Sequence, residues 1–107
     1  MLRTNHIKRS QIQEKRAAKD YSGSVTPGSG NGWIHKADVH SQYLLVECKT
    51  TTKKSYSIKE EDFMKLYYQA IIENKLPVFE IEFAESGRTL IVLDKNDFLA
   101  NIDAFSS

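Results

Sequence analysis

The chain has 107 residues, of which 40% are hydrophobic and 27% charged. This length suits a single domain, and this composition is that of an ordinary globular protein. No apolar run approaches the ~20 residues that a membrane-spanning helix needs, and the first residues lack the apolar stretch of a signal peptide. The single cysteine, Cys48, excludes an internal disulfide and a zinc site built on a cysteine pair. We therefore expect a cytoplasmic protein without a membrane partner.

The net charge of +1 hides an asymmetry along the chain. Residues 1–59 contain eleven Lys or Arg and four Asp or Glu, whereas residues 60–107 contain four and ten, which gives balances of +7 and −6. A basic half of this kind favours a polyanionic partner, with nucleic acid as the first candidate. The alternative is that the two halves neutralise each other in the fold.

The first predicted element is a helix over residues 5–20. Asn5 can cap it, and its body contains no Gly or Pro. Its apolar stripe is thin, while basic residues are dense: Lys8, Arg9, Lys15, Arg16 and Lys19. We expect a weakly packed helix with a positive, solvated face.

Four of the five glycines lie in the next segment, residues 22–32, which is predicted to be a loop with a brief strand at 23–26. Residues 33–40 and 43–50 follow as two strands, joined through Ser41 and Gln42 in a tight hairpin. In the second strand, a period of two places Glu47 and Lys49 on one face and Cys48 on the other, where it packs in the core.

The second half of the chain alternates helix and strand. Ser57 and Glu60 form a capping-box pattern for a helix that runs to about Asn74, and Pro77 ends this region. Strands are predicted at 78–83 and 89–93 with a turn at residues 86–87, and a short helix at 95–104. The predicted fold class is α/β or mixed α+β, a central mixed sheet of about five strands flanked by helices, in one domain over residues 1–107. Its parts are a basic helix (1–20), a Gly/Ser loop (22–32), a catalytic core (33–93) and a C-terminal helix and tail (95–107).

The residues with the clearest chemical potential are Asp38, Glu47 and Lys49. Neighbouring strands can bring the two carboxylates together, and Mg²⁺ takes oxygen ligands, usually one or two carboxylates with waters. Such a site can polarise a phosphoryl oxygen and lower the pKa of a bound water. Lys49 can hold the attacking water or neutralise charge on the phosphate. A Glu-x-Lys pattern is common on solvated strands, but here it ends an apolar strand, where charges are costly unless they serve a purpose.

Together with the N-terminal basic helix and the Gly28-Ser29-Gly30 loop, this pattern resembles the PD-(D/E)XK nuclease superfamily, most closely the small Holliday junction resolvases of archaea and phages. The resemblance spans residues 6–74. It implies a restriction-endonuclease-like core, metal binding by Glu14, Asp38 and Glu47, and catalytic roles for these three residues, Lys49 and Ser29. Asp20 is the alternative to Glu14. Ala37 precedes Asp38 where a proline is the family's signature, and the chain is shorter than typical resolvases.

The expected function is therefore that of a Mg²⁺-dependent, structure-selective DNA endonuclease in which Mn²⁺ can substitute. It would resolve branched DNA as a homodimer. The expected location is the cytoplasm, which would be the host cytoplasm if a phage encodes the protein. The alternatives are another nuclease of the superfamily, of restriction-like, repair or nicking type, or a non-catalytic DNA-binding module. The expected DNA contacts are Arg3, Lys8, Arg9, Arg16, Ser29, Lys53 and Lys54; for the last two lysines, a merely solvated loop is an equal alternative.

Overall fold

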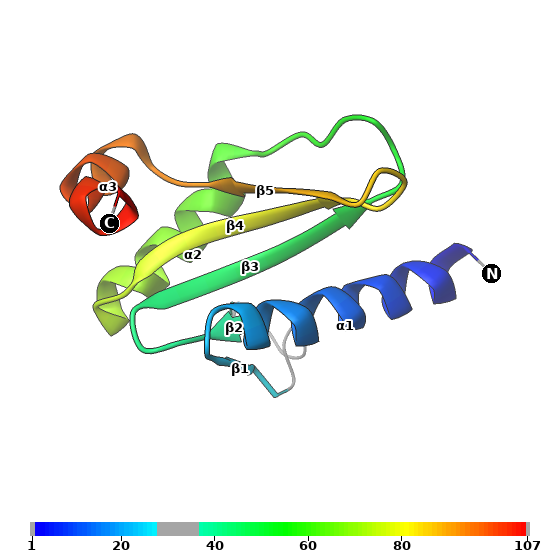
Figure 1. The fold of residues 1–107 in the computed structure, drawn as a ribbon, viewed down its shortest axis with the longest axis horizontal. Coiled ribbons are helices and arrows are strands. Elements are labelled where there is room, and N and C mark those ends of the chain that lie inside the picture. Colours follow the sequence, from blue (N-terminus) through cyan, green and yellow to red (C-terminus); the bar gives the residue numbers. More distant parts are fainter. Residues whose placement is uncertain (1, 28–36, 107) are drawn as a thin grey trace.

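The computed structural model describes residues 2–27 and 37–106, with side chains from Asn5 onward (Figure 1). The elements are α1 (Leu2–Asp20), β1 (Ser24–Val25), β2 (Val39–His40), β3 (Leu44–Thr51), α2 (Glu60–Glu73), β4 (Leu76–Phe83), β5 (Arg88–Val92), α3 (Lys95–Ala100) and α4 (Ile102–Ser106). Within the described residues the strands form one sheet in the order β1-β2-β3-β4-β5. Only β3 and β4 are parallel neighbours; the other pairs are antiparallel. The predicted class, a mixed five-stranded sheet flanked by helices, is confirmed.

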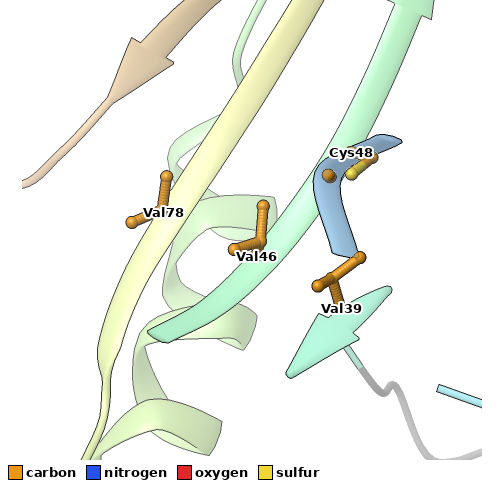
Figure 2. Close-up of a cluster of buried hydrophobic side chains, with 5 residues drawn as sticks. Val39, Val46, Cys48 and Val78 are labelled. Carbon is orange, nitrogen blue, oxygen red and sulfur yellow. The ribbon is translucent and has the colours of Figure 1, made fainter. Parts of the chain in front are cut away.

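The two long helices pack on opposite faces of the sheet. Side chains of β3 alternate between these faces, as those of any strand do. Val46 and Cys48 join a buried cluster with Val39, Val78 and Ala17 of α1, and Figure 2 shows the strand members of this cluster side by side. The intervening side chains face α2, where the buried residues Leu45, Leu66, Ala70 and Phe79 pack together with Ala37. Glu47 and Lys49 therefore lie on the α2 face, and Cys48 lies on the α1 face, as the period of two predicts.

Polar contacts, rather than a broad apolar stripe, attach α1 to the sheet. The buried Gln13 amide donates to the Lys49 carbonyl at 3.1 Å and to the Glu80 carboxylate at 3.2 Å. The Tyr21 hydroxyl also donates to the Glu80 carboxylate, at 2.6 Å. A third link joins Arg16 to the carboxylate of Glu82. These bonds supply the partners that buried polar groups require.

Two predicted helix starts are wrong. The helix α1 begins at Leu2, so Asn5 lies inside it. The capping box does not form either, because α2 begins at Glu60 after Lys59, and no side chain caps its N-terminus. Acidic residues in its first turn, starting with Glu60, instead stabilise the positive end of the helix dipole. The predicted end holds: Asn74 closes α2 in the left-handed conformation.

The remaining differences concern element boundaries. Of the strand predicted over residues 33–40, residues 33–36 lie outside the described residues, and in the rest only Val39 and His40 form a strand. Pro77 lies within β4 rather than before it, at the second position of that strand. The predicted C-terminal helix is two short helices, α3 and α4, and Asp94 caps the first by accepting a 3.1 Å hydrogen bond from the Asp97 amide. In the described parts of the chain, no helix combines the length and apolar character needed to cross a membrane.

Candidate active site

Asp38 is held against the middle of β3 by a short strand pairing. The strand β2 pairs with β3 only through Val39 and His40, and continuing this register places Asp38 opposite Glu47. The N–H of Cys48 accordingly finds its acceptor in a side chain: it donates to Oδ2 of Asp38 at 2.9 Å. The Asp38 carboxylate thus lies beside the Glu47-Cys48-Lys49 segment.

The backbone around Asp38 is fixed from both sides. Its carbonyl accepts a 2.8 Å hydrogen bond from the amide of Thr26 in the loop after β1. The N–H of Ala37 donates to Oε1 of Gln69 on α2 at 3.1 Å, and Nε2 of Gln69 donates to Glu73 at 2.9 Å. Gln69 is therefore a positioning residue for Asp38, a role that the sequence pattern around it did not indicate.

Glu47 and Lys49 form the charged pair at the centre of the site. The Lys49 ammonium lies 3.3 Å from Oε2 of Glu47, and Glu47 is only 5% exposed. Burial and the neighbouring Asp38 charge raise the pKa of Glu47 to about 7, although Lys49 acts in the opposite direction. Burial alone would lower the pKa of Lys49, but Glu47, Tyr56 and Asp38 together raise it, and the net shift is upward.

A third carboxylate, that of Glu14 on α1, interacts electrostatically with this site. Glu14 is half-buried, and its pKa is raised by burial and by the charge of Asp38. Glu14 in turn contributes to the raised pKa of Glu47. Asp20, the alternative considered from the sequence, is exposed and acts on Arg16 and Tyr21 instead. Of the two helix carboxylates, Glu14 is therefore the one whose charge interacts with Asp38 and Glu47.

The donor set suits a hard divalent cation, which prefers carboxylate oxygens. Like charges from Glu14, Asp38 and Glu47 oppose one another here, and a bound cation would relieve that repulsion. Among the described residues, no three ligand-type side chains are gathered closely enough to form a ready metal cluster. Mg²⁺ itself usually takes only one or two carboxylates, which Asp38 and Glu47 can provide.

The neighbouring side chains support the wall of the site. His40 contacts Oγ1 of Thr26 through Nδ1, and its Nε2 lies 3.7 Å from the carboxylate of Glu73, so it links β2 to α2. Tyr56, in the connection between β3 and α2, is a half-buried neighbour that sequence reasoning missed. Burial raises the pKa of Tyr56, and the charge of Lys49 acts in the opposite direction without reversing that shift. Tyr56 is therefore an electrostatic neighbour of Lys49. Nothing in the polar segment around Tyr56 distinguished it.

Cys48 does not belong to the reactive face. Burial and the carboxylate of Glu80 raise the pKa of its thiol well above the ordinary value. The thiol therefore stays protonated and packs with Val46 and Val78, as expected from the sequence.

The predicted DNA contacts have different environments. Lys8 is exposed on α1, and Lys53 and Lys54 are exposed on the connection after β3. Arg16 forms an ion pair with Glu82, so its guanidinium is less available to phosphates than the sequence suggests. Arg9 is partly buried and contacts Nδ1 of His6 at 3.3 Å. Ser29 and the side chain of Arg3 lie outside the described residues.

No family model matches the chain, and no curated protein matches its sequence.

Proposed function

We propose that this protein is a metal-dependent DNA endonuclease of the PD-(D/E)XK type that resolves four-way junctions. The observation that carries the proposal is the position of Asp38, hydrogen-bonded to β3 between Glu47 and Lys49. Two carboxylates and an ammonium group thereby come from β3 and from the residue before β2, and the charge of Glu14 on α1 acts on both carboxylates. Like charges near a largely buried carboxylate such as Glu47 are unfavourable unless a cation or a chemical role compensates for them.

Each residue has a distinct task in this proposal. Asp38 and Glu47 would hold Mg²⁺ or Mn²⁺, and Glu14 would add negative charge to the same site. The bound cation would supply Lewis acidity at the phosphoryl group and activate water. Lys49, held by Glu47, would orient that water or neutralise charge that develops on the phosphate.

Pairs of cuts need two active sites, and we propose that a homodimer supplies them. A single chain offers one Asp38/Glu47/Lys49 set, whereas resolution of a junction needs matched nicks in two strands. Two-fold symmetry is the commonest solution. Exposed apolar side chains on β5, α3 and α4 support this proposal: Leu90, Ile91, Phe98, Leu99, Ile102 and Phe105.

The decisive experiment is incubation with a labelled four-way junction and a linear duplex of matched sequence, with Mg²⁺ or with EDTA. We expect paired cleavage of the junction only with Mg²⁺, and loss of at least 100-fold in rate for Asp38→Asn and Glu47→Ala. Both variants should still bind the junction, because binding depends mainly on cations that contact phosphates. Glu61→Gln, an exposed carboxylate on α2, is the matched control.

The outcomes separate the possible functions. Cleavage of duplex and junction at equal rates would indicate a nicking or restriction-like nuclease of the same superfamily. Binding without cleavage under any metal condition would leave a non-catalytic DNA-binding module. Wild-type cleavage by the Asp38 or Glu47 variant would refute the active-site assignment.

A further inference from the structure

Three strand ends bring separate cations to one place on the sheet. The register pairs Thr51 of β3 with Phe83 of β4, and Phe83 with Arg88 of β5. The Ala84 amide donates to the Thr51 carbonyl at 2.9 Å, which ties the strand ends together. Because Lys53 and Lys54 follow Thr51 by two and three residues, they come to lie beside the start of β5. Figure 1 shows this connection and the β4–β5 turn at the same end of the molecule.

These cations surround a pocket of about 300 Å³ lined by Lys53, Lys54, Phe83, Glu85, Ser86 and Arg88. The turn that forms its rim is well defined. Gly87 has a φ of +76°, which favours glycine, and the Arg88 amide donates to Oγ of Ser86 at 3.2 Å.

The three cations are exposed at the protein surface. In the portions of the chain that the structure describes, neither lysine nor Arg88 makes an ion pair, although the Glu85 carboxylate also lines the pocket. Like charges held together repel one another, and an anion in the pocket relieves that repulsion. A phosphodiester backbone is the polyanion that arginine and lysine clusters commonly bind.

The pocket lies on the same face of the sheet as the candidate active site. Phe83 is paired with Thr51, which lies on the same side of β3 as Glu47 and Lys49 because side chains alternate. Lys53 follows Lys49 by four residues, a separation of at most about 13 Å in an extended chain. This length corresponds to roughly four nucleotides along a duplex, at about 3.4 Å each.

We propose that Lys53, Lys54 and Arg88 form a second phosphate-binding subsite, which holds the DNA backbone within about four nucleotides of the cleaved bond. This inference rests on the proposed function and adds Arg88 and a defined position to it. The subsite fixes the direction in which the DNA crosses the α2 face, and it acts in binding rather than in the chemical step.

The first test measures binding without chemistry. Fluorescence anisotropy with a labelled 20-base-pair duplex in EDTA, at several salt concentrations, compares wild type with Lys53→Ala/Lys54→Ala/Arg88→Ala. The slope of log K against log salt should become shallower by about 2.7, at about 0.9 for each lost phosphate contact. The matched control is Lys19→Ala/Lys75→Ala/Lys95→Ala, which removes the same charge from the end of α1, the residue before β4 and the start of α3, none of which lines the pocket. An equal change in both triple variants would overturn the subsite, because net charge would then explain it.

A charge-preserving variant and a positional test complete the design. Lys53→Arg/Lys54→Arg/Arg88→Lys keeps the three positive charges and should retain wild-type binding. If these side chains had only a structural role, this variant would not restore binding. In cleavage assays, a single neutral methylphosphonate two to four nucleotides from the cut should slow cleavage by the wild type by about tenfold and leave cleavage by the triple alanine variant unaffected. Equal sensitivity of both proteins at that position would refute the subsite. Absence of all cleavage, with the binding result intact, would instead count against the proposed nuclease function.

Discussion

At the scale of single residues, the site depends on how Asp38 is held rather than on the charged residues alone. The alternation of β3 predicts that Glu47 and Lys49 share a face, and the structure places them 3.3 Å apart. The sequence could not predict that the Asp38 side chain accepts the Cys48 amide, because this bond exists only where β2 stops pairing. It could not identify Gln69 either, since that contact crosses between elements that are distant along the chain.

Glu47 makes the stability of the metal-free protein depend on pH. Its folded-state pKa of about 7 exceeds the ordinary 4.5, so its contribution to stability is complete below about pH 4.5 and is lost as the pH rises through 7. Asp38 and Glu14 strengthen this effect, while Lys49 opposes it. We expect Glu47→Gln to be more stable than wild type at pH 8 by up to about 3 kcal/mol, and nearly equal to it at pH 4.5.

Urea denaturation in EDTA across this pH range measures the difference. Glu61→Gln, an exposed control, should show no such trend. Added Mg²⁺ should stabilise the wild type at pH 8 and have little effect on Glu47→Gln. A difference between wild type and Glu47→Gln that stays constant with pH would contradict the raised pKa.

Gln69 gives a second residue-scale prediction. Removing its Oε1 in Gln69→Ala leaves the Ala37 amide without that acceptor and loosens the backbone before Asp38. We expect cleavage to fall by about tenfold and half-saturation to need more Mg²⁺, with unchanged DNA binding. Gln69→Glu keeps an acceptor for the Ala37 amide but replaces the donor to Glu73 with a second carboxylate, so it should recover only part of the loss. Tyr68→Ala, at an exposed neighbouring position, is the control. If Gln69→Ala and Tyr68→Ala reduced the cleavage rate equally, the cause would be a general disturbance of α2 and not the loss of the Gln69 contact.

At the scale of elements, the sequence predicts where most helices and strands lie, but not how α1 packs. Glu80 and Glu82 alternate with apolar residues in β4, a pattern typical of a strand with one solvated face. They are instead buried, at 5% and 8% exposed, because α1 covers that face and brings Gln13, Arg16 and Tyr21 to them. The basic residues of α1 alone suggested only a solvated helix.

The link between Arg16 and Glu82 is therefore expected to stabilise the fold. Arg16→Ala leaves a largely buried Glu82 carboxylate without its cation, and the half-exposed position of the arginine limits the cost to about 1 kcal/mol. Lys15→Ala, its exposed neighbour, should change the unfolding free energy by less than about 0.5 kcal/mol. Urea denaturation at pH 7 compares the two. Equal stabilities for both variants would mean that Arg16 is free to contact DNA, as the sequence first suggested.

At the scale of the whole molecule, exposed apolar side chains of β5, α3 and α4 lie apart from the candidate active site on β2 and β3. Phe79 is buried in the core and takes no part in this surface. Leu90 and Ile91 project from opposite faces of β5, and each is nearly half exposed. Within the described residues β5 is an edge of the sheet, and such an edge offers unpaired backbone groups to another strand. Nearby in the sequence, the rings of Phe98 and Phe105 stack at 5.6 Å.

A second copy of the chain is the partner we propose for this surface. The six apolar side chains on β5, α3 and α4 expose on the order of 500 Å² per copy, taking ~150–250 Å² for each full side chain. A standard interface buries about 800 Å² on each partner, so pairing of two β5 edges around a two-fold axis would bring the total close to that size. The active site at the β2–β3 side would remain open in such a dimer.

Ile91→Lys should therefore convert the dimer into a monomer, because it places a charge in the apolar interface. Light scattering at micromolar concentration should give twice the chain mass for wild type and the single-chain mass for the variant. Ile72→Lys, at an 84% exposed position on α2, makes the same chemical change outside this surface and should remain dimeric. The monomeric variant should still nick one strand of a junction while losing paired cuts, since each chain retains its own Asp38, Glu47 and Lys49. A wild-type protein that stays monomeric both free and on a junction would rule out paired resolution.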